Sequence, residues 1–208
     1  MKKITLFLVA VLMSGVMYGQ FHIGPQIGYT ASKLSYKGSD ISNGLKHNML
    51  IGVFMRIGKK IYVQPEVNYM TQGSVFKFPL TGGSSSVVEQ NVNLKSIQVP
   101  LSIGWQFVNL KIIKLRVFGG ATANFIVDKT IDTKNGSPKD YLLPQDFNNI
   151  QWQYQLGVGV DILMFALDVK YYGGINDLFN GTVKYDGASH SVTGASNVFE
   201  VTLGWKIL

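Results

Sequence analysis

The chain has 208 residues, of which 46% are hydrophobic and only 15% are charged, with 23 glycines, no cysteine and a formal net charge of +7. Soluble domains carry roughly 25% charged residues and disordered chains are richer in charge still, so this composition excludes disorder and argues against an ordinary soluble surface. The lack of cysteine excludes a disulfide framework, a thiolate metal site and a cysteine nucleophile.

The first residues have the organisation of an export signal. Lys2 and Lys3 form a positive start, and Ile4 to Val16 is an apolar stretch too short to span a bilayer as a helix. We therefore expect residues 1–19 to be a cleaved signal peptide and residues 20–208 to form one outer-membrane β-barrel domain. An uncleaved anchor helix is the alternative, which the short apolar length disfavours.

After this segment, apolar residues recur at every second position, which is typical of strands with one buried face. Each run is about nine to eleven residues long, the length that a tilted strand needs to cross a membrane. The pattern predicts eight strands, over residues 21–29, 48–57, 61–69, 97–107, 115–125, 151–161, 165–172 and 199–207.

The connections between these strands alternate in length. Short turns are expected around residues 58–60, 108–114 and 161–164. Long loops are expected over residues 31–46, 72–95, 127–150 and 173–198. This layout is typical of an antiparallel up-and-down outer-membrane barrel with four long extracellular loops and three short periplasmic turns.

The two faces of the expected strands differ in chemistry. One face is apolar and carries no charge, as lipid contact demands, because a lysine or arginine at mid-bilayer costs roughly 2–4 kcal/mol. The other is mostly glycine, serine, threonine, asparagine and glutamine, which suits a narrow lumen better than the exterior of a soluble lipocalin-like barrel, the competing interpretation. Charges on this inner face are expected to pair with one another across the lumen: Arg56, Glu66, Arg116, Asp168, Lys170, Glu200 and Lys206.

Large aromatic residues gather near the ends of the expected strands. Two such groups predict two aromatic belts, one at each membrane interface. Their main members are Tyr29, Tyr69, Phe125, Trp152, Tyr154, Tyr171 and Phe199 toward the long loops, and Trp105, Phe107 and Trp205 toward the short turns.

Four segments carry a resemblance to a known family: YVQPEVNY at residues 62–69, IQVPLSI at 97–103, YYGGINDL at 171–178 and VTLGW at 201–205. They resemble the PorT-like outer-membrane β-barrel family of Bacteroidota. The resemblance implies a barrel fold and a link to protein secretion or surface assembly, since the founding member takes part in secretion across the outer membrane. The chain departs from many outer-membrane barrels by ending in leucine rather than an aromatic residue.

The chain contains a few residues that could serve catalysis or ligand binding. Ser189, His190 and Ser191 with Asp186 nearby resemble parts of a nucleophilic triad, but a polar loop explains them better. Glu66 beside Arg56 or Arg116 could be an activated acid, although a structural ion network is the better explanation. His22 and His47 lack the spacing of metal ligands, and Gly157-Val-Gly159 lacks the third glycine of a dinucleotide loop.

Four lysines are expected on the short-turn rim: Lys59, Lys60, Lys111 and Lys114. They fit contact with anionic headgroups or a periplasmic partner, and turn solubility explains them equally well. The chain has no dense basic patch for nucleic acid.

Taken together, the sequence predicts a monomeric, non-enzymatic scaffold in the bacterial outer membrane, without catalytic residues, cofactor or metal. Its expected partners are outer-membrane lipid and envelope or secretion-system proteins. The alternatives are a barrel enzyme acting on lipid or protein at the rim, and a narrow channel for small solutes.

Overall fold

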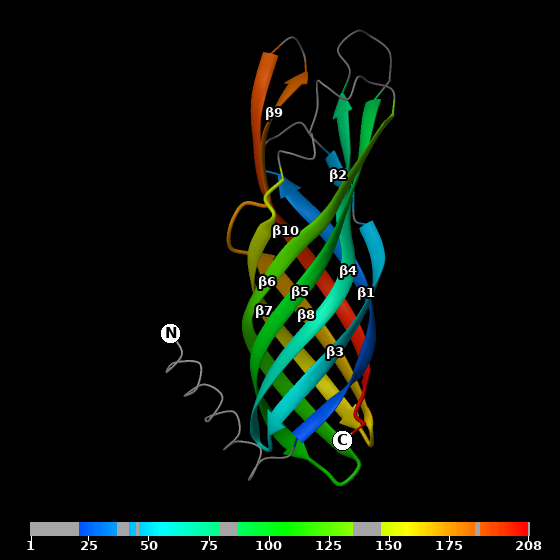
Figure 1. Ribbon diagram of the computed structural model, residues 1–208, viewed down its shortest axis with the longest axis vertical. Coiled ribbons are helices and arrows are strands. Elements are labelled where there is room, and N and C mark those ends of the chain that lie inside the picture. Colours follow the sequence, from blue (N-terminus) through cyan, green and yellow to red (C-terminus); the bar gives the residue numbers. More distant parts are fainter. Residues whose placement is uncertain are drawn as a thin grey trace.

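The computed structural model of the protein describes residues 21–36, 42–44, 46–79, 87–134, 147–185 and 188–207 (Figure 1). The expected signal peptide, residues 1–19, lies outside these ranges. No helix in the described ranges has both the length and the apolar character needed to cross a membrane.

The described chain folds almost entirely into strands. In chain order these are β1 (Phe21–Tyr36), β2 (Ser42–Gly44), β3 (Lys46–Gly58), β4 (Ile61–Pro79), β5 (Val87–Asn109), β6 (Ile113–Lys134), β7 (Ile150–Ile162), β8 (Phe165–Gly174), β9 (Phe179–Tyr185) and β10 (Ala188–Trp205).

Eight of these strands close into an antiparallel barrel. They pair in the order β1-β3-β4-β5-β6-β7-β8-β10, and β10 returns to pair with β1. The two short strands lie off this circuit, β2 against β4 and β9 against β10. The predicted fold class, a closed all-β barrel of eight antiparallel strands, is therefore confirmed.

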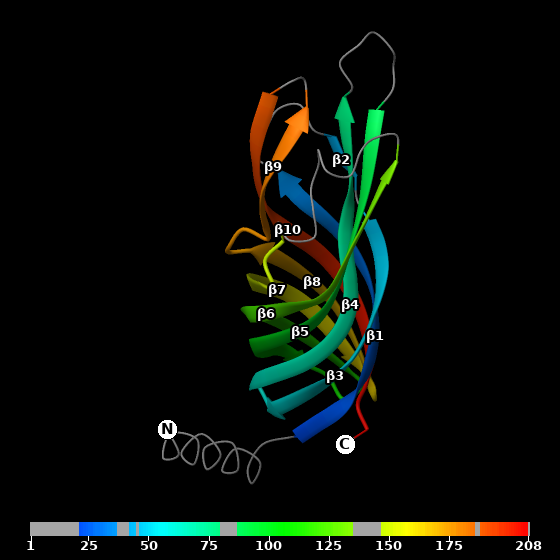
Figure 2. The same ribbon diagram turned by 45° about the horizontal axis from the view of Figure 1, so that its top comes forward.

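The strand register fixes how strongly the barrel strands tilt. The register partners of Phe21 can be followed once around the barrel through Ile57, Val63, Ile103, Gly119, Leu156, Tyr171 and Phe199, and they return to β1 at Ala31. The stagger is thus ten residues, from 21 to 31. Such a stagger requires strongly inclined strands around a narrow lumen, and Figure 2 shows this inclination.

Successive side chains along each strand point alternately outward and into the lumen. Outward positions such as Ile51, Ile103 and Leu156 are large, apolar and about 60% exposed. Inward positions such as Gln98, Ser102 and Gln155 are polar and almost fully buried. A soluble protein rarely exposes so continuous an apolar surface, whereas a closed barrel in lipid requires one.

Glycine makes room inside the lumen at positions beside large rings. A Cβ atom on Gly104 would lie 2.2 Å from the ring of Tyr62, and one on Gly204 would lie 2.6 Å from the ring of Phe54. Both rings are almost fully buried. The high glycine content therefore lets aromatic side chains fill the narrow interior.

The strands run further than the sequence pattern predicts. β4 and β5 stay paired as far as Pro79 and Val87, and β5 pairs with β6 as far as Glu89 and Lys134. Most of the expected loop 72–95, and the first third of the expected loop 127–150, is therefore strand. β9 and β10 form a further hairpin inside the expected loop 173–198. Figure 1 shows these hairpins rising beyond the body of the barrel. The sequence pattern does not predict these extensions, because strands outside the bilayer need no apolar outward face.

At the opposite rim the connections are short. They consist of Lys59–Lys60, Leu110–Ile112 and Leu163–Met164. The first residue of β1 and the last residue of β10 lie at this same rim, at the lower end of the barrel in Figure 1. We call it the short-turn rim below.

Replacing Gly104 by alanine tests the role of the lumen glycines. The added Cβ would force the buried Tyr62 ring to move, and overpacking of this kind costs about 1–3 kcal/mol of unfolding free energy. Urea unfolding in lipid vesicles measures the loss. Gly119→Ala is the matched control, because its Cβ meets the flexible Leu156 side chain at 3.1 Å. Equal stability of the two variants would contradict the packing argument.

Candidate functional site

The charged residues of the lumen come from strands far apart in the sequence. Arg56 lies on β3, Glu66 on β4, Arg116 on β6, and Asp168 and Lys170 on β8. Together with Glu200 on β10 they are at most 4% exposed, and Lys206, just after β10, is partly buried. Each faces inward because it occupies the position alternate to an apolar, lipid-type residue. The barrel thus brings all seven predicted residues into its interior or to its mouth.

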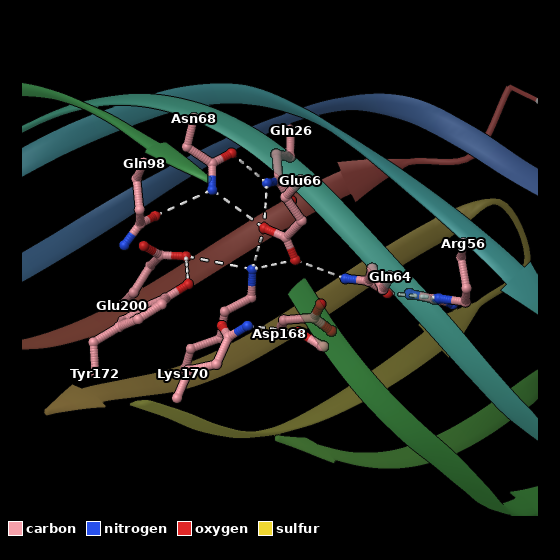
Figure 3. Close-up of polar contacts among 12 residues, drawn as sticks. Gln26, Arg56, Gln64, Glu66, Asn68, Gln98, Asp168, Lys170, Tyr172 and Glu200 are labelled. Carbon is pink, nitrogen blue, oxygen red and sulfur yellow. Dashed lines mark hydrogen bonds and ion pairs between the residues drawn. The ribbon is translucent and has the colours of Figure 1, made fainter. Parts of the chain in front are cut away.

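The upper group of charges is centred on Glu66 and Lys170 (Figure 3). The Lys170 ammonium donates to both Glu66 carboxylate oxygens, at 2.8 and 2.7 Å, and its Nζ lies 3.4 Å from Oε1 of Glu200. The Tyr172 hydroxyl donates to that same Glu200 oxygen at 3.3 Å. Lys170 therefore holds two carboxylates from opposite parts of the sequence.

Three amide side chains complete the surroundings of Glu66. Gln26 and Gln64 each donate to one of its oxygens at 2.8 Å, and Asn68 donates at 3.2 Å. With the two bonds from Lys170, the carboxylate accepts five hydrogen bonds. A buried charge is tolerated only when it is paired and hydrogen-bonded, and Glu66 meets both conditions.

The lower group of charges is centred on Asp161, at the end of β7. Its Oδ2 lies 2.7 Å from Nη1 of Arg56 and 3.2 Å from Nζ of Lys206, and its Oδ1 lies 2.8 Å from Nη2 of Arg116. The same Nη2 atom of Arg116 lies 2.5 Å from Oδ1 of Asp168. One carboxylate thus joins β3, β6, β7 and the segment after β10.

The two groups are linked and their charges balance. Arg56 donates through Nε to Gln64 at 2.7 Å, and Gln64 donates in turn to Glu66. The four basic members are Arg56, Arg116, Lys170 and Lys206, and the four acidic members are Glu66, Asp161, Asp168 and Glu200. Four positive and four negative charges leave a formal sum of zero, which lowers the cost of burying them together.

Aromatic rings pack among the lower charges. The guanidinium carbon of Arg56 lies 5.0 Å from the Tyr62 ring centroid, and that of Arg116 lies 5.8 Å from the Phe118 centroid. Arg116 also donates to the Tyr62 hydroxyl at 3.2 Å. Guanidinium groups close to aromatic rings gain cation–π attraction. Rings and charges together fill the lumen at this level.

A second, apolar group of buried side chains lies within the same barrel. Leu50, Met70, Tyr172 and Val198 form one core cluster, contributed by β3, β4, β8 and β10. Tyr172 connects this cluster to the charges through its hydroxyl. The interior is therefore packed by both polar and apolar layers, as expected for an eight-stranded barrel.

The ion network was predicted only in part. Asp161 stands at the junction of the expected strand 151–161 and the expected turn 161–164, and it is missing from the predicted inward charges. Its alternation with Gly157 and Gly159 is the signal that could have added it. Glu66 was considered as a partner of Arg56 or Arg116, whereas the structure pairs it with Lys170. Nothing in the sequence pattern indicates that Gln26 and Gln64 would form hydrogen bonds with the charged groups.

The ten aromatic residues predicted to form the belts all point outward, and each residue is 39% to 52% exposed. Tyr69 and Phe125 lie on one row of paired residues, separated by Ile97. Trp105 and Phe107 lie with ring centroids 6.0 Å apart, and Tyr154 and Tyr171 lie 6.3 Å apart. These rings would meet headgroups with their polar edges and acyl chains with their faces.

The motifs considered for catalysis or metal binding are dispersed. His47 stacks on Tyr29 with centroids 5.6 Å apart. Ser189, His190 and Ser191 belong to β10, paired with β9, but their side chains and the whole of Asp186 lie outside the described residues. Within the described ranges, no group of three or more histidines and carboxylates could hold a metal ion.

Comparison with known proteins was made by sequence profile and by structure. The profile of a family described as outer membrane protein beta-barrel domain matches residues 14–180. No curated protein sequence matches the chain.

Among solved structures, the outer membrane protein OprG from Pseudomonas aeruginosa has 11% identity and a TM-score of 0.56, with 91% of this chain and 96% of OprG covered. Ail, the attachment invasion locus protein of Yersinia pestis, has 12% identity and a TM-score of 0.45, with 90% and 99% covered. At this identity, the likeness to OprG is one of fold alone.

Replacing Asp161 by asparagine tests the lower charge group. The change keeps the size of the side chain but leaves Arg56, Arg116 and Lys206 short of a counter-charge, and breaking a buried ion pair costs about 3–5 kcal/mol. Unfolding by urea in lipid vesicles would measure this loss.

The matched control is Asp128→Asn, on an exposed ion pair. The Lys95 ammonium donates to the Asp128 carboxylate at 2.8 Å. This pair lies on the long-loop side of the belt residue Tyr69. The hydrogen bond and the lysine charge hold the pKa of Asp128 below its usual value. Exposed pairs contribute little to stability, so this variant should unfold like the wild type. Wild-type stability of Asp161→Asn would rule out a structural role for the network.

Proposed function

The chain belongs to the family of outer membrane protein β-barrel domains, and on this premise we propose that it is a small non-enzymatic scaffold that presents its outer strands and loops from a sealed barrel. It would act as a monomer in outer-membrane lipid, after export by its signal peptide. The outer-membrane location follows from the family.

The observation that carries the proposal is the closed charge network of the lumen. Its members on the barrel strands are almost fully buried and contact mainly one another, and the charges of all eight members sum to zero. A conducting lumen needs water along its walls, and an eight-stranded barrel is just wide enough for side chains to fill. This favours a scaffold over the channel considered from the sequence.

The same bonding argues against an enzyme. Glu66 is held by Lys170 and three amides, so neither carboxylate oxygen is left to attack or to accept a proton from a substrate. A catalytic acid or base must reach its substrate within hydrogen-bonding distance. The buried charges lack access of this kind.

Partner binding is the second part of the proposal. Pairing of β6 with β7 ends at Phe125 and Ile150, whereas pairing of β6 with β5 continues to Lys134. In the part of the chain that the structure describes, residues 127–134 therefore have β5 as their one strand neighbour. An exposed edge of this kind can add a strand from another protein, and we propose that envelope or secretion-system proteins dock here, as the resemblance to PorT-like proteins suggests.

A conductance measurement tests the sealed lumen. Purified, folded protein in planar bilayers should give no discrete current steps, because the ion network blocks the water path. Heat-modifiable mobility in detergent gels confirms folding, and a water-filled porin in the same membrane is the positive control. Discrete steps from the folded protein would overturn the closed-lumen part of the proposal.

Site-specific photocrosslinking in intact cells tests the partner site. A photoreactive residue at the exposed Thr130, on the edge of β6 opposite β5, where the described ranges hold no further strand, should give a discrete protein adduct. The same probe at Leu101, on the apolar outward face, should give none because lipid surrounds it. Absence of a protein adduct from Thr130, or equal adducts at both positions, would contradict docking at this edge.

A further inference from the structure

The short-turn rim carries a one-signed surface charge. Lys59, Lys60 and Lys111 are exposed, and Lys114 is half-buried at the mouth of the barrel. None of them forms an ion pair with another residue in the described ranges. The acidic residue of this rim, Asp161, points into the lumen and is almost fully buried. The described surface of this rim is therefore positive, whereas the opposite end carries both signs, as at Lys95 and Asp128.

Two apolar hollows lie in the outward wall above these lysines. In the larger one, the outward position Gly119 leaves the wall without a side chain. The larger hollow, about 660 Å³, is lined mainly by Ile61, Ile103, Trp105, Val117 and Leu156. The smaller, about 300 Å³, is lined mainly by Phe107, Leu115, Val158, Val160, Leu167 and Val169. Both face the surroundings that lipid chains would occupy.

Each hollow lies beside an exposed lysine. Lys60 immediately precedes Ile61, which lines the larger hollow. Lys111 lies in the turn between Phe107 and Leu115, which line the smaller hollow. The backbone N–H of Gln106 donates to the Lys60 carbonyl at 2.7 Å, which ties this turn to the adjacent strand β5. Positive charge is therefore fixed at the end of two neighbouring apolar hollows.

We propose that this face of the barrel is a binding site for an anionic phospholipid. The two acyl chains lie in the two hollows, and the phosphate lies against the lysines of the short-turn rim. An apolar wall alone accepts the chains of any lipid, so the selectivity comes from the lysines, which attract anionic headgroups. Trp105 and Phe107 stand at the level between chains and headgroup, where aromatic rings are favoured. The site adds to the scaffold role and does not depend on it.

Fluorescence quenching by brominated lipids tests this site directly. The chain has three tryptophans, so the double substitution Trp152→Phe and Trp205→Phe leaves Trp105, which lines the larger hollow, as the one reporter. The protein is folded into vesicles that contain brominated phosphatidylglycerol or brominated phosphatidylcholine in competition with the unbrominated lipid. The relative binding constant should favour phosphatidylglycerol by about fivefold or more, the effect expected when at least one lysine contacts the headgroup.

Substitution of the four rim lysines by glutamine identifies the source of the preference. The K59Q/K60Q/K111Q/K114Q variant should bind the two lipids equally, because the hollows remain and the charge is gone. Lys95→Gln, at the opposite end of the barrel, is the matched control and should keep the wild-type preference. High salt should weaken the preference in the wild type, because mobile ions screen exposed charges.

Filling the larger hollow separates chain binding from headgroup binding. Gly119→Val places a side chain in this hollow, where its Cβ would lie 3.1 Å from the flexible Leu156 side chain. Quenching of Trp105 by both lipids should fall, since the brominated chains are held further away. Heat-modifiable mobility shows that each variant is folded.

Three results would overturn the proposal. The first is equal binding of the two lipids by the single-tryptophan protein. The second is a preference for phosphatidylglycerol that survives loss of all four lysines. The third is protection of Trp105 from both lipids together with a dimeric mass in solution, which would make a second copy of the chain the occupant of this face.

Discussion

The pairing of β1 with β10 is the interaction on which the rest of the structure depends. A bilayer offers no water to unpaired N–H and C=O groups, so a sheet inside it must have no free edge. Eleven residue pairs between β1 and β10, from Gln26–Gly204 to Tyr36–Gly194, close that edge. Every other feature follows from closure: the outward face can be wholly apolar, and the inward face is removed from lipid.

Closure also sets the space that the side chains must fill. Eight strands with a stagger of ten residues enclose a lumen too narrow for a large side chain at every inward position. Glycine beside tyrosine and phenylalanine is one consequence. The other is that charges inside must pair with one another. The eight ionic groups, with Gln64 between Arg56 and Glu66, form a single connected set of contacts that runs from Lys206 to Glu200.

The strands and their outward faces could be predicted from the sequence, because contact with lipid restricts each outward residue individually to an apolar side chain. An outward position such as Ile51 or Leu101 must be apolar, so alternation revealed the strands and their faces. Beyond the bilayer this constraint ends, and for that reason the continuation of β4 and β5 as strands was not visible. Alternation showed that Glu66 and Lys170 face inward, but their pairing joins residues 104 positions apart and depends on register, which single residues do not encode. Asp161 was missed because its chain position suggests a turn, while its face suggests the lumen.

The position of Asp161 late in the chain has a consequence for assembly. The lumen charges of β1 to β6 are Arg56, Glu66 and Arg116, which sum to +1, and those from β7 onward are Asp161, Asp168, Lys170, Glu200 and Lys206, which sum to −1. A half-barrel made of the first strands would therefore hold two arginines without their carboxylates. Insertion of such an intermediate into lipid is costly, and electrical neutrality is reached only when the last strands arrive. The buried charges are therefore balanced in a complete barrel and unbalanced in a truncated one.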